Sequence, residues 1–421
     1  MNLKEQSQKL PQSLTIEPAL EAIVKAGRLL MENGAEIHRI ELTVNHMAQA
    51  LGIKGFEAFV MNRGIFVSGL NSQGLAEAKV ITTQETGMNL RILDEVNALS
   101  RRISQEPSWT PSNILQELNH IEGRSDYSAL TSLLAYFVGA GGFAWALGST
   151  LIDTLISAST GLFIGLLLHW MNPWLKTSFV RIILASGLAT LAVHGLVLTG
   201  LGQSRSLILL GAFMVLIPGA TFVNAIREFS QSNYPTGLSL ALSALLTCIS
   251  ISVGVAASLG LIPRATPLSA GFSLDHLSIL DFLTRSLAAG IGTVAFSVFY
   301  SVPRRFFKEL GVLGTLTWLL YLIIATSTGK EALAIFIPGL IIAAMSQILA
   351  IYRKSPATMF LVTSMFPLLP GISFYRATYL VLTGSTDLAL QQMRTSFISA
   401  FTIAIAITLA QQIPWKKWLS F

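Results

Sequence analysis

The sequence is poor in charge and in cysteine. Only 12% of its 421 residues are charged, whereas 52% are hydrophobic and the mean hydropathy is +0.61. A soluble domain carries about 25% charged residues, so this composition excludes an ordinary soluble protein and indicates a membrane protein. Cys248, in an apolar run, is the single cysteine of the sequence. Because a disulfide needs two cysteines, an intrachain disulfide is excluded.

Motifs for nucleotide hydrolysis and for catalysis are also missing. The sequence has no Walker phosphate-binding loop, no GxSxG nucleophile motif and no metal-ligand spacing, since His38 and His46 are eight residues apart rather than four. The first 18 residues are polar, so we expect no cleavable signal peptide. We therefore expect no catalytic residues, no bound metal and no cofactor.

The charges that are present divide the chain in two. Residues 1–128 hold 12 basic and 15 acidic residues, whereas residues 129–421 hold 16 basic and 7 acidic residues. The positive charge therefore belongs to the apolar part. We attribute it to loops at a membrane surface and expect no nucleic-acid partner.

Residues 1–128 predict a small α+β domain. Apolar residues recur at helical spacing over 16–51, and two short apolar runs flank Asn62-Arg63-Gly64 as in a β-hairpin. A third strand is predicted at 78–83, and further helices at 89–104 and 112–121.

Residues 129–413 predict about ten transmembrane helices, since a span needs about 20 apolar residues. They form two groups of five, 129–262 and 279–413. With the N-terminal domain in the cytoplasm, its side of the membrane carries ten basic loop residues, Arg227 among them, and the other side at most six, which favours cytoplasmic N- and C-termini. The expected spans are 130–148, 151–170, 179–200, 207–226, 237–262, 279–300, 310–327, 331–351, 357–380 and 395–413.

One short motif occurs in both groups: LIPGATF at 216–222 and LLPGISF at 368–374. An offset of 152 superposes Pro218-Gly219 on Pro370-Gly371 and Phe222 on Phe374. Proline lacks the N–H that a helix interior needs, so each motif is expected to break its span. Because five spans is an odd number, the second group enters the bilayer from the opposite side, and the groups are predicted to be inverted repeats.

The two breaks are the candidate substrate site. Freed N–H groups and helix dipoles at a broken span can receive a carboxylate, and a nearby arginine can bind one with two hydrogen bonds. A kink that serves packing alone is the alternative, and Arg376 can instead extend to the outer interface. The predicted substrate-binding residues are Pro218, Gly219, Asn224, Pro370, Gly371, Ser373 and Arg376.

Asp153 is the candidate for proton coupling. It lies at the beginning of the second span, where burial of an ionisable group usually reflects function. Capping of a helix start is the alternative role. His194 in the third span is a second group that could relay protons or simply bond to its neighbours.

With these residues in hand, the chain resembles the bacterial threonine/serine exporter family over nearly its whole length. The matching segments are ENGAEIHRIELTVNHMAQALGI (32–53), GIFVSG (64–69), ALGSTLIDTL (146–155) and YRKSPATMFLVTSMFPLLPGISFYRA (352–377). The last resembles a module that is a separate small membrane protein in some members, and here the two modules are fused. The turn Met61-Asn62-Arg63 departs from the Thr and Pro that members often carry. The resemblance implies ten spans, a cytoplasmic N-terminal domain and efflux driven by the membrane gradient.

The sequence thus predicts a secondary active exporter of small hydrophilic metabolites in the plasma membrane. Threonine and serine, driven by the proton gradient, are favoured. Export of C4-dicarboxylates such as succinate stays open, because Arg376 and two helix termini suit a zwitterion or a dianion. An integral-membrane enzyme is the less favoured class, because it would need a cluster of nucleophile and base or of metal ligands. The expected partners are the small-molecule substrate, protons, the lipid bilayer and a second copy in a homo-oligomer.

Overall fold

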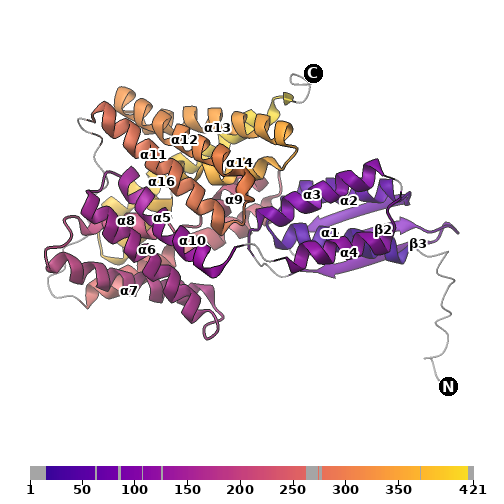
Figure 1. The fold of residues 1–421 in the computed structure, drawn as a ribbon, viewed down its shortest axis with the longest axis horizontal. Helices are drawn as coiled ribbons and strands as arrows, with labels where there is room; N and C mark the ends of the chain where they lie inside the picture. Colours follow the sequence, from indigo (N-terminus) through magenta and orange to yellow (C-terminus); the bar gives the residue numbers. More distant parts are fainter. Residues whose placement is uncertain are drawn as a thin grey trace. The chain divides into compact units, whose positions relative to one another are not determined.

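The computed structural model describes residues 16–61, 64–83, 87–106, 108–124, 127–261, 274, 277–369 and 371–415. The chain forms two compact units, residues 1–126 and 127–421 (Figure 1). The first unit ends two residues before the boundary expected from the sequence. Each unit is described by itself below.

The N-terminal unit is an α+β domain, as predicted. Its antiparallel sheet has the order β1-β2-β3, and Phe59 pairs with Phe66, which pairs with Val80. Helices α1 and α2 pack against the sheet over a core that includes Ile23 and Ile65. The predicted turn at Asn62-Arg63 lies outside the described residues. The elements are α1 (Glu17–Glu32), α2 (Ile37–Ala50), β1 (Lys54–Met61), β2 (Gly64–Leu70), β3 (Ala76–Thr82), α3 (Leu90–Gln105) and α4 (Pro111–Gly123).

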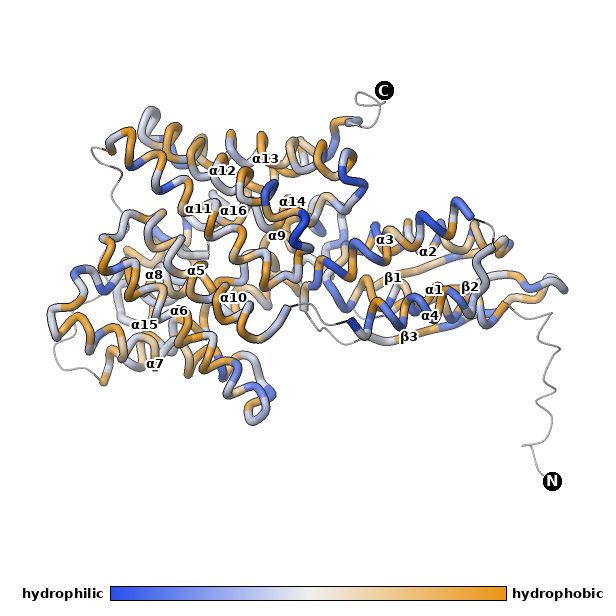
Figure 2. Tube along the Cα trace, viewed as in Figure 1, coloured by the Kyte–Doolittle hydropathy of each residue, from blue (hydrophilic) through white to orange (hydrophobic). Residues whose placement is uncertain are grey.

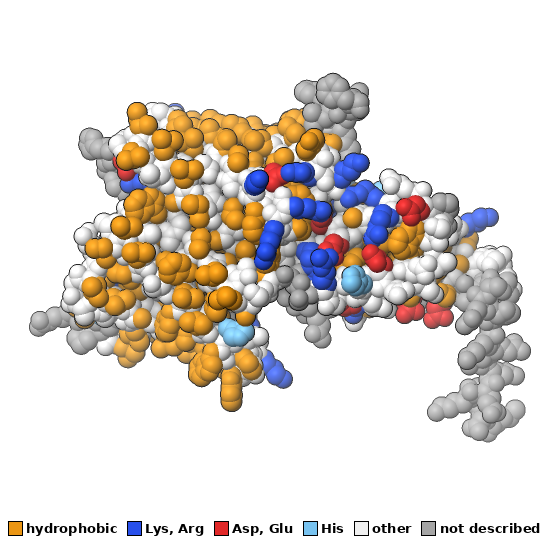
Figure 3. Space-filling model, in the orientation of Figure 1, with side chains coloured by type: hydrophobic (Ala, Val, Ile, Leu, Met, Phe, Trp, Pro, Cys, Tyr) orange, Lys and Arg blue, Asp and Glu red, His pale blue; other side chains and the backbone are white. Residues whose placement is uncertain are grey.

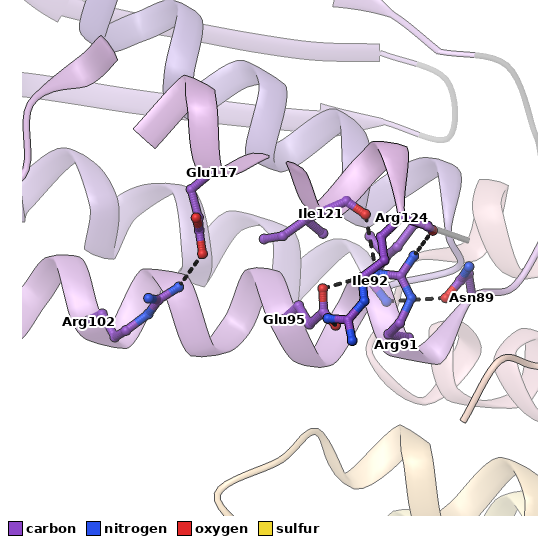
Figure 4. A network of polar contacts seen from close by, with 8 residues as sticks. All are labelled: Asn89, Arg91, Ile92, Glu95, Arg102, Glu117, Ile121 and Arg124. Carbon is purple, nitrogen blue, oxygen red and sulfur yellow. Dashed lines mark hydrogen bonds and ion pairs between the residues drawn. The ribbon is translucent and has the colours of Figure 1, made fainter. Parts of the chain in front are cut away.

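Polar contacts join α3 to α4 (Figure 4). Arg91 is buried and donates hydrogen bonds to the carbonyl oxygens of Ile121 at 3.2 Å and Arg124 at 2.9 Å, as well as to Glu95 at 3.0 Å. It therefore satisfies carbonyl groups that the end of α4 leaves without helical partners. These contacts give Arg91 a structural role in the unit.

The second unit is helical and apolar, with hydrophobic residues along most of its helices (Figure 2). Leu130, Leu238 and Ile279 are more than 60% exposed, and hydrophobic side chains cover most of the face of this unit in Figure 3. Such a surface suits contact with lipid rather than water. The helices are α5 (Ala129–Ala146), α6 (Leu151–Met171), α7 (Ser178–Leu198), α8 (Arg205–Phe213), α9 (Gly219–Ser230), α10 (Tyr234–Gly260), α11 (Ile279–Phe299), η1 (Arg304–Phe306), α12 (Phe307–Thr328), α13 (Glu331–Arg353), α14 (Ala357–Ser364), η2 (Phe366–Leu368), α15 (Gly371–Leu382) and α16 (Thr386–Gln412).

Among the described residues, eight continuous helices are long and apolar enough to cross a membrane, and α14 with α15 forms a ninth span if this pair, bent by 42°, counts as one. All ten segments expected from the sequence fall on helices. The expected span 207–226, however, is divided into α8 and α9, separated by residues 214–218. The polytopic helical class is confirmed, and the count of ten spans stays a prediction.

Contacts within the second unit repeat from one half to the other. Helix α7 packs on α10 as α13 packs on α16, and α9 packs on α10 as α15 packs on α16. The first helices of the two halves, α5 and α11, run antiparallel. The Tyr136 ring lies 4.6 Å from that of Phe299, whereas Gly142, further along α5, lies against Ala288, which precedes Phe299 on α11. This reversal of direction is what an inverted repeat requires.

Candidate functional site

The two helix breaks lie against each other inside the second unit. A Cβ atom built on Gly219 would lie 2.6 Å from Leu369, and one built on Gly371 would lie 2.1 Å from Ile217. An offset of 152 converts the first pair into the second, so the contact is reciprocal, as across a two-fold axis. Only glycine leaves room for this approach at either position.

An aromatic pair continues this contact. The rings of Phe222 on α9 and Phe374 on α15 stack with centroids 5.2 Å apart and planes inclined by 9°. These residues occupy the same position in the two copies of the motif. The breaks, which the sequence places far apart along the chain, are thus brought together in the structure.

The predicted substrate-binding residues that the structure describes lie on α9, at its N-cap, or on α15, and they differ in how deeply they are buried. Pro218 caps the start of α9 and is half-buried, whereas Asn224 is buried on the same helix. Ser373 is half-buried in the first turn of α15. Gly219 and Gly371 are buried at the contact itself, and Pro370 lies outside the described residues.

Arg376 is half-buried on α15, five residues after the break. Within the described part of the chain, its guanidinium forms no hydrogen bond and no ion pair. A guanidinium in an apolar surrounding is costly without a partner of opposite charge. Its five N–H donors are therefore available to an incoming carboxylate.

Tyr375 is a further candidate site residue, which the sequence did not reveal. Its side chain is 1% exposed, its ring meets the edge of Phe213 at 5.7 Å, and its hydroxyl has no hydrogen-bond partner among the residues described. Arg376 and Arg205 both lie within electrostatic range of this hydroxyl. The first copy of the motif has Val223 in place of Tyr375, and that polar difference between two otherwise similar copies is the signal that could have identified it.

Arg205, the first residue of α8, connects this region to α7. Its Nη1 lies 3.1 Å from Nδ1 of His194, so the histidine, considered above as a proton relay, is bonded to a neighbour. The arginine can only donate, and Nδ1 therefore acts as the acceptor. His194 has a structural partner in this arrangement.

Asp153 is fully buried and holds the segment that precedes α8. Its carboxylate accepts the backbone N–H groups of Gln203 at 2.8 Å and Ser204 at 3.1 Å. Its own helix is capped by the Thr150 hydroxyl instead. The carboxylate thus anchors a segment 50 residues away, directly before Arg205.

Arg227 differs from its expected place in a cytoplasmic loop. It is 2% exposed on α9, and its Nη1 donates to the Thr358 hydroxyl on α14 at 2.7 Å. Its neighbour Glu228 is equally buried and accepts a hydrogen bond from Asn233 at 2.9 Å. Helix α9 continues to Ser230, and this places both charges inside the unit, where partners are required.

Broken helices that meet inside an apolar helical unit, beside a cation with no hydrogen bond or ion pair among the described residues, are an arrangement found in membrane transport proteins. Comparison with known proteins narrows the class. The family described as "Putative threonine/serine exporter" matches residues 21–262, and the one described as "Threonine/Serine exporter, ThrE" matches residues 285–413. The chain therefore belongs to the threonine/serine exporter family, with both modules fused.

One relative is the "Probable threonine/serine exporter" of Mycobacterium tuberculosis (strain ATCC 25618 / H37Rv). It is 20% identical over 410 residues, which cover 93% of this chain and 75% of that protein. A search of solved structures finds no match. The chain is accordingly a multi-pass membrane protein of an exporter family, with a small-molecule substrate.

Proposed function

We propose that the chain exports threonine and serine across the plasma membrane in exchange for protons. The observation that carries this proposal is Arg376, a half-buried guanidinium without a hydrogen bond or ion pair in the described structure, placed directly after one of the two meeting breaks. It would bind the substrate carboxylate, with Asn224 and Ser373 as further polar contacts around Gly219 and Gly371. The comparisons give no support to dicarboxylate export, nor do they name an enzyme, and we propose no catalytic role.

Proton coupling is proposed for Asp153. As a carboxylate it can accept both N–H groups before α8, whereas a protonated acid has one oxygen that donates instead. Protonation would therefore weaken the hold on Gln203 and Ser204, and the next residue is Arg205, which lies near Tyr375. A proton could in this way change the position of α8 relative to the substrate site.

The direct test is counterflow in proteoliposomes that contain the full chain. We expect exchange of threonine and serine, stimulated by a proton gradient, and none of succinate. In Asp153→Asn we expect the gradient to lose its effect, because the amide cannot take up the proton. Gradient-independent exchange by the parent protein would contradict proton coupling, and exchange of succinate in place of the amino acids would contradict the substrate.

A second prediction concerns Tyr375. Replacement by phenylalanine should raise the KM for threonine about three- to tenfold, the loss expected for one hydrogen bond to the substrate. The thermal stability should be unchanged or higher, because the lost hydroxyl has no partner among the described residues. Tyr379→Phe, one helical turn further on, is the control. A normal KM with Tyr375→Phe would show that the hydroxyl does not contact the substrate.

Cytoplasmic termini are also part of the proposal, with residues 1–128 gating or assembling the transporter. If the halves are inverted, Gln203 and Lys354, which are exposed after α7 and α13, lie on opposite sides of the membrane. We expect Gln203→Cys to react with an impermeant thiol reagent in whole cells and Lys354→Cys to react only after permeabilisation. The native Cys248 is buried and should not react. Labelling of both positions from one side would rule out the inverted arrangement.

A further inference from the structure

An apolar groove of about 880 Å³ runs along the surface of the second unit between α5, α11 and α12. Its floor contains small residues, because Gly290 brings α11 close to the backbone of Gly311 on α12: a Cβ on Gly290 would lie 2.6 Å from the Gly311 oxygen. Larger side chains, among them Leu134 and Val312, form its walls. Because the residues between α11 and α12 are small, no large side chains fill the groove at this place.

The groove has the length of one leaflet of a bilayer. Along α12 it extends from Phe307 to Leu319, and along α11 from Leu287 to Val298. At 1.5 Å per residue these stretches give about 18 Å on α12 and about 16 Å on α11. Half the hydrocarbon core of a membrane is about 15 Å, which is the depth that a lipid acyl chain occupies.

Basic side chains gather at one end of the groove. Lys308 lines it, is exposed, and forms no hydrogen bond or ion pair with the residues that the structure describes. The exposed Arg304 lies 5.6 Å from the ring of Tyr127, which stacks on Phe307 in the groove wall. The nearby carboxylate of Glu309 is paired with Arg353 and does not neutralise Lys308.

We propose that this groove binds an anionic phospholipid, with one acyl chain along α11 and α12 and the phosphate held by Lys308 and Arg304. The apolar groove, as deep as one leaflet, accommodates the acyl chain. The two basic side chains favour a negatively charged headgroup. The lipid belongs to the leaflet in which α5 begins. This site is independent of the substrate site at the two helix breaks.

Native mass spectrometry of the purified full chain tests the proposal with phosphatidylglycerol and phosphatidylcholine of identical acyl chains. We expect a retained molecule of phosphatidylglycerol and little phosphatidylcholine. Lys308→Gln should weaken phosphatidylglycerol binding about fivefold, the factor for one cation at a membrane surface. Lys176→Gln is the control, because Lys176 is also exposed but lies in the loop between α6 and α7 and does not line the groove.

A second experiment tests whether the groove holds the acyl chain of the lipid. Leu134→Trp fills the groove and should abolish retention of phosphatidylglycerol, whereas Leu155→Trp, at a position of equal exposure outside the groove, should not. Elution volume and thermal unfolding verify that each variant is folded. Equal retention of the two lipids, or unchanged retention in Leu134→Trp, would overturn the proposal.

Discussion

Replacing Arg376 by lysine is expected to reduce threonine export at least tenfold while the protein still folds and inserts. The guanidinium is planar and can give a carboxylate two parallel hydrogen bonds, whereas an ammonium acts as a single point charge. Hydrogen bonds to charged groups contribute about 1.5–3 kcal/mol each, so the loss of one corresponds to a factor of about 10 to 100.

The control for this prediction is Arg394→Lys on α16, where the arginine is exposed. Counterflow at several threonine concentrations distinguishes a binding defect from a general loss of activity. If Arg376 only extends to the membrane interface, lysine should replace it without loss, since a long cationic side chain is sufficient there. Near-normal export by Arg376→Lys would therefore leave the two breaks to hold the substrate alone.

Alanine at Gly371 is expected to abolish export. Its Cβ would lie 2.1 Å from Cγ2 of Ile217, far inside contact distance, and the two breaks would have to move apart. Overpacking of this kind costs about 1–3 kcal/mol in a well-packed interior. The double variant Gly371→Ala with Ile217→Ala removes the clashing atom and should recover part of the activity.

Gly195→Ala on α7 is the matched control, because nothing lies within 4 Å of its Cβ position. Alanine also favours a helix over glycine by about 1 kcal/mol, so this variant should be as stable as the parent or more so. Counterflow and thermal unfolding of the parent, Gly371→Ala, Ile217→Ala and the double variant form a double-mutant cycle. Parent-level export by Gly371→Ala would contradict the close approach of the breaks.

The sequence predicted the features that depend on local chemistry. Hydropathy located the helices of the second unit, and the two Pro-Gly pairs located the interruptions, because proline acts on its own turn of helix. Two short apolar runs that flank Asn62-Arg63-Gly64 likewise located the hairpin of the first unit. The repeat offset predicted which residues are equivalent, and the stack of Phe222 on Phe374 joins one such pair.

Features that depend on distant parts of the chain were not predictable in the same way. Capping of its own helix was the alternative role expected for Asp153, but its carboxylate accepts hydrogen bonds from Gln203 and Ser204, and no local pattern encodes a contact over 50 residues. Arg227 was assigned to a loop because a charge ends an apolar run, yet its bond to Thr358 permits burial. The surroundings of the Tyr375 hydroxyl, which has no hydrogen-bond partner among the described residues, also depend on tertiary packing.

The reciprocal contact between the breaks also has a consequence for biogenesis. Gly219 is covered by Leu369, which the ribosome adds 150 residues later. At typical rates of synthesis this delay is roughly 10–30 s. During that time the first half resides in the bilayer with its interrupted helix uncovered, open to lipid or to insertion chaperones. Where the two modules are made as separate chains, the same interval is set by diffusion and by the supply of the second chain.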